Sequence, residues 1–283
     1  MKKVKIHIST SHDVYANLAL EEYLVTQSND DILLFYINSP SVVIGKHQNP
    51  WKEVDLTLRN EKKHTLARRL SGGGTVYHDR GNINFSFIRN KNQDLVNFKE
   101  HIIPISAALE KLGISNIISP RNDIFVNDHK VSGNAEHVNS KLGRILHHGT
   151  LLYDSDLIRL NGSIRPQKKY EIKTHAVNSV RSPVMNMRVV SDHGETRLFL
   201  NSLINQLQTI LVVDQIEYID PIVIPDVSSL IAEKYETWDW NFGHTPQFEF
   251  TDDNGNLFRI RKGRVLESED TSLIGKTFES LLL

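Results

Sequence analysis

The chain has 283 residues, of which 39% are hydrophobic and 24% are charged, and its formal net charge is −1. This composition is that of an ordinary globular protein, and the small charge gives no reason to expect nucleic acid or a membrane as a partner. The sequence contains no cysteine, which excludes disulfides, thiolate metal sites and any reaction through a cysteine thioester. The first residues, MKKVKIHIST, hold no apolar run of signal-peptide or membrane-span length, so we expect a cytoplasmic protein.

The first part of the chain predicts short strands around two helices. Alternation of Val4, Ile6 and Ile8 with polar residues predicts a half-buried strand, and a helix is expected from about Asp13, as its N-cap, through ANLALEEYL. A second helix is predicted over 98–113. Short apolar runs broken by turn residues predict strands at 32–37, 41–45, 65–70, 75–79 and 82–88.

Three more strand-like stretches follow, namely DIFVND, HKVSGNAEHV and GRILHHGTLLYD. The basic segment 165–183 lacks a sustained period and predicts a long loop of the kind that covers a site. Helices are expected near 194–211 and 226–236, and Asp253-Asn254-Gly255 predicts a hairpin turn. Because strands and helices do not alternate regularly, we expect an α+β fold with mixed or antiparallel sheets and flanking helices, divided into a large domain (1–237) and a small α+β appendage (238–283).

The most informative stretch is ARRLSGGGTVYHDRGNINFS, at 67–86. Three consecutive glycines alone are more often a flexible turn than a site. Here two arginines precede them and a strand follows, so backbone N–H groups could approach phosphate oxygens while a guanidinium neutralises the charge. No Walker-type GK[ST] follows, so the stretch is not a P-loop.

Two further stretches carry candidate chemistry. Lys130 precedes Ser132-Gly133, where the missing side chain leaves room for a ligand beside the backbone, although a lysine at such a turn is usually only solvated. The pair His147-His148 suggests a metal site, but the sequence has no HExxH motif and no second ligand set at metal spacing. The sequence therefore gives only weak support to a metal site at the paired histidines.

Taken together, these stretches resemble the lipoate–protein ligases of the biotin/lipoate ligase superfamily. The matching segments run in order over about the first 243 residues: NLALEE (17–22), VVIGKHQNPWKEV (42–54), ARRLSGGGTVYHDRGN (67–82), RND (121–123), KVSGNA (130–135), HHGTLL (147–152), SVRSPV (179–184) and WDWNFG (238–243). The resemblance implies a cytoplasmic enzyme that activates lipoate with ATP and Mg²⁺ to lipoyl-AMP. It also implies transfer of the lipoyl group to a lysine of lipoyl domains, in 2-oxoacid dehydrogenase E2 subunits or the glycine-cleavage H protein.

The resemblance also implies roles for individual residues. Lys130 would be the catalytic residue, in contact with both the adenylate phosphate and the acyl carbonyl oxygen. ATP or the adenylate would be bound by Arg69, Gly74, Thr75, Val76, Tyr77, Asn122, Asp123 and Lys130, with Asp123 facing Mg²⁺. Lipoate would be bound by Ser71, Gly72, Gly73, His78, Lys130, Ser132, Gly133, His148 and Thr150. Apolar side chains for the C8 acyl chain would come from Val43, Ile44, Leu70 and Val76, for which core packing is the competing interpretation.

The alternatives are an octanoyltransferase, a biotin–protein ligase, a non-catalytic acyl-carrier binding module and a lipoyltransferase. An octanoyltransferase working through a cysteine is excluded by the absence of cysteine. A biotin–protein ligase would carry a GRGRxGR loop where this chain has RRLSGGG. A non-catalytic binding module would not need Lys130 and Arg69 around a glycine loop. The segment after WDWNFG is shorter than the accessory domain of ligases that act alone, which keeps open a lipoyltransferase that uses preformed lipoyl-AMP or needs a partner subunit for adenylation.

Overall fold

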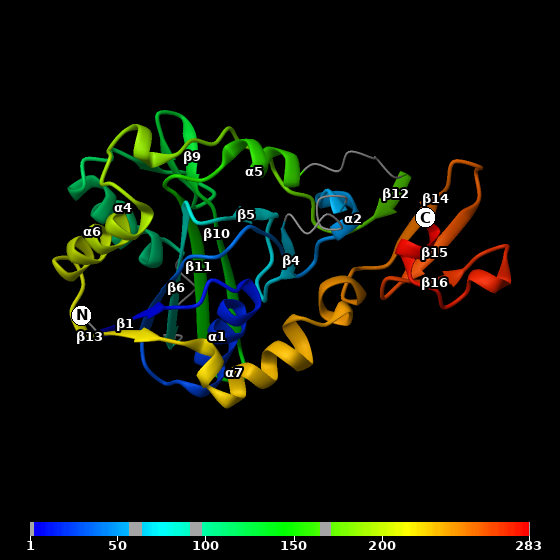
Figure 1. Cartoon of the computed structure of the whole chain (residues 1–283), viewed down its shortest axis with the longest axis horizontal. Helices are drawn as coiled ribbons and strands as arrows, with labels where there is room; N and C mark the ends of the chain where they lie inside the picture. The colour runs from blue at the N-terminus through cyan, green and yellow to red at the C-terminus, as the bar shows by residue number, and fades with distance from the viewer. Residues whose placement is uncertain (1–2, 57–63, 91–97, 165–170, 283) are drawn as a thin grey trace.

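A six-stranded mixed sheet forms the centre of the molecule (Figure 1). The computed structural model describes residues 3–56, 64–90, 98–164 and 171–282. Strand β1 runs parallel to both β2 and β13, and the pairs β2–β6, β6–β11 and β11–β10 are antiparallel. The strands, in sheet order, are β10 (Asn134–Asn139), β11 (Arg144–Leu152), β6 (Asn82–Asn90), β2 (Ile32–Tyr36), β1 (Val4–Ser9) and β13 (Val213–Ile219). The predicted α+β fold with a mixed sheet is confirmed.

Helices cover both faces of this sheet, which explains why all five residues of β2 are apolar and buried. Ile32, Leu34 and Tyr36 pack into the core on the side of α1 (Val14–Gln27) and α7 (Pro225–Leu230). Leu33 and Phe35 pack into the core on the side of α4 (Lys99–Lys111) and α6 (Thr196–Gln208). Alternate side chains of a strand point to opposite faces, so a strand covered on both faces has no polar side.

Most of the predicted local elements are present. Asp13 caps α1, and its carboxylate accepts a hydrogen bond from the N–H of Ala16 at 2.8 Å. The predicted helices over 98–113 and 194–211 are α4 and α6, and the one near 226–236 is α7 continued by a short π-helix, η3 (Ile231–Tyr235). The remaining helices are short: α2 (Pro50–Glu53), α5 (Leu157–Ser163), η1 (Met187–Val189), η2 (Pro221–Val223), η4 (Asp239–Gly243), η5 (Thr271–Leu273) and η6 (Phe278–Leu281).

Two small sheets flank the central one and carry the glycine-rich loop and Lys130. The first has the order β4–β3–β5, with β3 (Ser41–Ile44), β4 (Thr65–Arg68) and β5 (Val76–His78); the second has the order β7–β8–β9, with β7 (Ile117–Ile118), β8 (Ile124–Val126) and β9 (His129–Ser132). The prediction of one strand-like stretch in HKVSGNAEHV was wrong. The chain breaks at Gly133, so that β9 and β10 belong to different sheets.

The C-terminal residues form a four-stranded antiparallel sheet with the order β12–β14–β15–β16. Its strands are β12 (Glu171–Thr174), β14 (Phe248–Thr251), β15 (Leu257–Arg261) and β16 (Arg264–Glu267). The hairpin predicted at Asp253-Asn254-Gly255 connects β14 to β15, with Gly255 at a φ of 87°. Part of the predicted loop 165–183 is therefore a strand, because β12 pairs with β14; residues 165–170 of that loop lie outside the described residues. This pairing means that a boundary between 237 and 238 divides one sheet.

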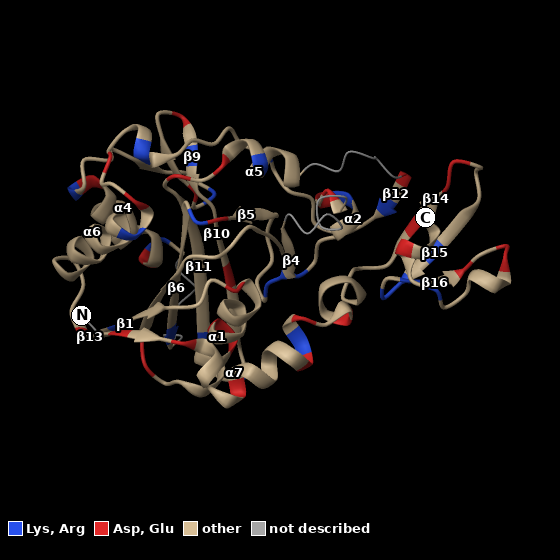
Figure 2. Cartoon of the chain, in the orientation of Figure 1, with Lys and Arg blue, Asp and Glu red and all other residues tan. Residues whose placement is uncertain are grey.

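Charged residues of both signs are interspersed along the chain (Figure 2), in keeping with the net charge of −1. Within the described ranges, no helix combines the length and the apolar character that crossing a bilayer requires.

An aromatic cluster joins the C-terminal sheet to the rest of the molecule. Trp51 of α2 is 1% exposed. Its ring centroid lies 5.6 Å from that of Phe242, 5.5 Å from that of Phe248 and 5.0 Å from that of Phe278. A buried tryptophan that touches three rings at these spacings contributes both apolar area and ring–ring contacts.

We expect Trp51→Ala to lower the free energy of unfolding by about 3–5 kcal/mol, because it would leave a cavity in the aromatic cluster that joins the C-terminal sheet to the rest of the molecule. Ile158→Ala is the matched control: Ile158 is 88% exposed, so its loss should change stability by less than about 0.5 kcal/mol. Urea unfolding measures both. Equal effects of the two substitutions would show that Trp51 does not hold a shared core.

Candidate active site

Two neighbouring cavities, of about 190 and 310 Å³, lie beside the glycine-rich loop. The first is lined by the glycine-rich loop, by residues of the central sheet such as Tyr36 and His148, and by Val43 of the small sheet that contains β3. The second extends toward α5, with Leu160 and Ile164 in its wall. The residues that line both are Thr75, Val76, Lys130, Gly133, Thr150, Ser179, Val180 and Ser182. Two chambers with a shared wall could hold two ligands side by side.

Most of the predicted site residues line one or both cavities. The first cavity collects Arg69, Gly73, Gly74, Thr75, Val76, His78, Asp123, Lys130, Gly133, His148 and Thr150. The second collects Thr75, Val76, Tyr77, Lys130, Ser132, Gly133 and Thr150. The predicted contacts Ser71, Gly72 and Asn122 line neither cavity, and of the four apolar candidates for the acyl chain Val43 and Val76 line the first, whereas Ile44 and Leu70 lie in the packed core.

Lys130 stands where the two cavities meet. Its Nζ lies 2.9 Å from the Oδ1 of Asp123, and the two side chains are 25% and 14% exposed. A Cβ added at Gly133 would lie 3.1 Å from that Nζ. The space predicted beside Gly133 is thus occupied by Lys130 itself, and a side chain at that position would require the end of Lys130 to shift by a few tenths of an ångström.

The glycine-rich loop is held from behind by Arg69. Its Nε donates to the Oγ of Ser71 at 2.9 Å, its Nη1 to the carbonyl of Val43 at 3.1 Å, and its Nη2 to the carbonyls of Gly72 at 2.6 Å and Gly74 at 2.7 Å. Burial lowers the pKa of Arg69 to about 10, so it stays charged at neutral pH.

The backbone N–H groups of the three glycines in the loop, Gly72, Gly73 and Gly74, have no hydrogen-bond acceptor among the described residues. Gly73 has a φ of 84°, a backbone conformation that favours glycine. The carbonyl oxygen of Gly73 would lie 2.2 Å from a Cβ at Gly45, so Gly45 leaves the space that the loop needs. Of the three loop glycines, Gly73 and Gly74 line the first cavity, and unused N–H groups beside a cavity suit an anionic ligand.

Sequence reasoning missed the residues that brace the loop from the opposite side. Ser179 accepts a hydrogen bond from the N–H of Thr75 at 2.9 Å and donates to the carboxylate of Glu53 at 2.5 Å. Gln48 accepts hydrogen bonds from the N–H of Gly45 and the hydroxyl of Thr75. These residues lie in the segments 42–54 and 179–184 that carried the family resemblance, but no local pattern in either segment pointed to the contact.

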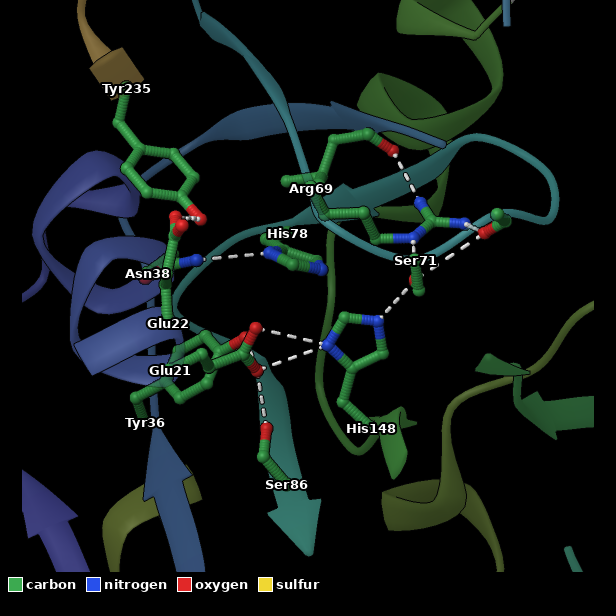
Figure 3. A network of polar contacts seen from close by, with 12 residues as sticks. Glu21, Glu22, Tyr36, Asn38, Arg69, Ser71, His78, Ser86, His148 and Tyr235 are labelled. Atoms are coloured by element: carbon green, nitrogen blue, oxygen red, sulfur yellow. Dashed lines mark hydrogen bonds and ion pairs between the residues drawn. The ribbon is translucent and has the colours of Figure 1, made fainter. Parts of the chain in front are cut away.

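A buried polar chain connects α1, β11 and the loop (Figure 3). The Nδ1 of His148 lies 3.0 Å from the Oε2 of Glu21, and its Nε2 lies 2.6 Å from the Oγ of Ser71. The same carboxylate accepts hydrogen bonds from the hydroxyls of Tyr36 and Ser86. Because a carboxylate only accepts, Nδ1–H of His148 donates to it, which leaves Nε2 to accept from Ser71 when the imidazole is neutral.

Glu21 was not among the predicted site residues, although it lies in the segment NLALEE. Burial opposes its ionisation, but His148 and the hydrogen bonds from Ser86 and Tyr36 outweigh burial and hold its pKa below the usual value. Glu21 is therefore an ionised carboxylate that orients His148 at the cavity wall.

His78 lies beside this chain and is held neutral. The amide of Asn38 donates to its Nδ1 at 3.0 Å. Burial, and then the charges of Arg69 and His148, lower its pKa to about 3 from an ordinary 6.5. In the unfolded chain His78 takes up a proton below pH 6.5, and in the folded protein it does not until about pH 3.

This difference predicts that His78 makes the protein less stable as the pH falls below 6.5, by about 1.4 kcal/mol per pH unit. His78→Gln should lower the free energy of unfolding at neutral pH. It should also make the free energy of unfolding depend less steeply on pH, because one proton fewer is taken up on unfolding. The measurement is urea unfolding of both proteins at neutral pH and at about pH 5. Identical slopes would mean that His78 is protonated in the folded state.

Comparison with known proteins identifies the family. Residues 13–208, more than half of the chain, match the model of the lipoyl protein ligase A/B catalytic domain. The chain is 36% identical over 282 residues to the lipoate-protein ligase LplJ of Bacillus subtilis, covering 94% of this chain and 83% of that protein.

Solved structures agree. A lipoate-protein ligase A bound with ATP has a TM-score of 0.71 and 26% identity, covering 86% of this chain and 99% of its own. A bi-partite lipoate protein ligase from Thermoplasma acidophilum, described together with its E2 lipoyl domain, has a TM-score of 0.72 and 25% identity, covering 86% and 98%. A family model over most of the fold and a relative at this identity leave one conclusion: the chain belongs to the lipoate-protein ligase family.

Proposed function

We propose that this enzyme activates lipoate with ATP and transfers the lipoyl group to a lysine of a folded lipoyl domain. The observation that carries the proposal is the position of Lys130, on the wall shared by two cavities. The first cavity offers apolar Leu18, Val43 and Val76 to an acyl chain, and the second offers Lys52 and Arg181 as cations for a nucleotide. Lipoate and ATP placed in this way would bring carboxylate and α-phosphate together at Lys130.

In the first step a carboxylate oxygen of lipoate attacks the α-phosphorus of ATP, and the bond to the β-phosphate oxygen breaks to release pyrophosphate. Negative charge gathers on the groups at the junction as this bond forms. A fixed ammonium stabilises charge where it develops. Lys130 supplies it, and the unused N–H groups of Gly73 and Gly74, which line the first cavity, offer further donors to phosphate oxygens that reach the shared wall.

Asp123 is the proposed Mg²⁺ contact. Its carboxylate borders the first cavity and is partly exposed, and a single carboxylate together with nucleotide phosphates and waters is a usual set of ligands for Mg²⁺. When bound, the ion would neutralise phosphate charge. Asp123 now pairs with Lys130 at 2.9 Å, so moving the carboxylate to another cation would free the ammonium for the adenylate.

In the second step the ε-amine of the acceptor lysine attacks the carbonyl carbon of lipoyl-AMP, an amide forms, and AMP leaves with the phosphate oxygen. The amine must be neutral, yet only about one free lysine in a few thousand is neutral at pH 7. The positive charge of Lys130 next to the incoming amine favours the neutral form, and holding the amine in place raises its effective concentration.

A second candidate function is transfer from preformed lipoyl-AMP alone. One observation favours it: the structural relative from T. acidophilum is described as bi-partite. In that case Lys130 and the first cavity would act only in the second step, with adenylation supplied by a partner subunit.

Lys130→Ala should lower the rate of lipoylation by about 10²–10³-fold, since it removes the charge at the junction of the cavities. The assay follows the mass of a folded lipoyl domain incubated with enzyme, lipoate, ATP and Mg²⁺. Lys141→Ala is the matched control, because Lys141 is an exposed lysine outside both cavities; it should retain full activity. Near-normal turnover of a folded Lys130→Ala protein would contradict the catalytic role.

The acceptor should be recognised by its folded shape, because placement of the lysine supplies much of the second step. We expect a denatured lipoyl domain, or a short peptide with the same lysine and its neighbours, to be modified far more slowly than the folded domain. Lipoyl domains from an E2 subunit and the H protein can be compared in the same mass assay. Equal rates for peptide and domain would show that the enzyme reads local sequence or releases free adenylate.

A further inference from the structure

Three polar side chains converge on the face of the central sheet opposite the active-site cavities. Glu136 of β10 and His147 of β11 are directly paired across the two strands, and His101 of α4 lies over them. The ring of His101 stacks on that of His147, with centroids 4.9 Å apart and an angle of 23°. His147 and His148 are consecutive in β11, so their side chains point to opposite faces of the sheet. His148 is therefore not part of this cluster, and the residues that surround His147 come from distant parts of the sequence.

The cluster is buried and its polar atoms are incompletely paired. The side chains of His147, His101 and Glu136 are 0%, 3% and 3% exposed. The Oε2 of Glu136 lies 3.2 Å from the Nδ1 of His147 and 3.9 Å from the Nδ1 of His101. Among the described residues, that nitrogen of His101 has no hydrogen-bond partner, although buried polar atoms normally have one. A distance of 3.9 Å is too long for a hydrogen bond.

A bound cation would account for this arrangement. One ligand atom from each of the three residues lies within 4.8 Å of the others. Ligands at the usual Zn²⁺ distances of about 2.0–2.2 Å lie about 3.3 Å from one another in a tetrahedral site. The 3.2 Å between Glu136 and His147 matches this value, and His101, at 3.9 Å from Glu136, would have to move closer when the ion binds. We propose that His101, Glu136 and His147 bind one divalent transition-metal ion of the Zn²⁺ class, with water as a fourth ligand.

The donor types select this class of metal. Two imidazoles and one carboxylate suit Zn²⁺ and its neighbours, whereas Mg²⁺ and Ca²⁺ prefer oxygen ligands only. Arg89, whose guanidinium lies over the ring of Phe87 next to His101, opposes a cation. The negative carboxylate of Glu136 is therefore the decisive ligand.

Such an ion would act on the active site from behind. It would tie α4 to β10 and β11, and those strands also carry Asn134, Ala135, His148 and Thr150 in the wall of the first cavity. The ion would be a structural tie and would not touch lipoate or ATP.

The test uses the full chain, freed of metal by a chelator and titrated with Zn²⁺ or Co²⁺ in the absence of ATP. We expect one equivalent to bind, Co²⁺ to show the visible absorption of tetrahedral coordination, and Zn²⁺ but not Mg²⁺ to raise the melting temperature. Glu136→Gln and His101→Gln should each weaken binding at least tenfold. His137→Gln is the matched control, because His137 lies next to Glu136 but on the other face of β10, and it should bind like the wild type.

Two results would overturn the proposal. The first is that the wild-type protein shows no tetrahedral Co²⁺ spectrum. Glu136 and His147 would then share a proton instead of a metal ion. This measurement uses the wild-type protein alone, so it does not depend on whether a variant folds. The second is binding that survives both Glu136→Gln and His101→Gln, or that His137→Gln weakens to the same extent, which would assign the ion to other histidines.

Discussion

The shape of the glycine-rich loop depends on the guanidinium of Arg69, which lies buried behind the loop and not on its surface. A buried charge is costly unless its hydrogen bonds are satisfied, and here carbonyl groups of Val43, Gly72 and Gly74 accept them. With two of the loop's carbonyls turned toward Arg69, the N–H groups of Gly73 and Gly74 have no acceptor among the described residues and lie in residues that line the first cavity. The loop therefore offers donors for an anion without a lysine of its own, unlike a P-loop.

The hydrogen bonds of Arg69 continue into other parts of the fold. Ser71 connects Arg69 to His148, and His148 connects to Glu21 of α1. Arg68, the neighbour of Arg69 in the sequence, donates to the carbonyls of Gly45 and Lys46 and to the carbonyl of Asn241. These hydrogen bonds connect η4 to the loop that follows β3. The site is thus assembled from the central sheet, a small sheet and the C-terminal part, and none of these could move far without disturbing it.

Sequence patterns predicted the features that depend on neighbours along the chain. The cap at Asp13, the apolar run of β2 and the turn at Gly255 are such local signals. The expectation of a half-buried β1 was wrong, because all of its residues except Lys5 are buried. The room expected for a ligand beside Gly133 is taken up by Lys130. Long-range features were missed. Nothing local indicated that β12 pairs with β14, that Ser179 braces Thr75, or that Arg69 would turn inward. His101 and Glu136 meet His147 only through the packing of α4 on the sheet, which is why the paired histidines gave no metal prediction.

The central claim is that one chain brings a carboxylate and a nucleotide together at Lys130. The most direct measurement is release of pyrophosphate by the wild-type chain given ATP, Mg²⁺ and lipoate without any acceptor. We expect lipoate-dependent release of about one pyrophosphate per active site, because the adenylate stays bound until an amine arrives. Absence of pyrophosphate, together with normal transfer from added lipoyl-AMP, would contradict it and assign adenylation to another protein.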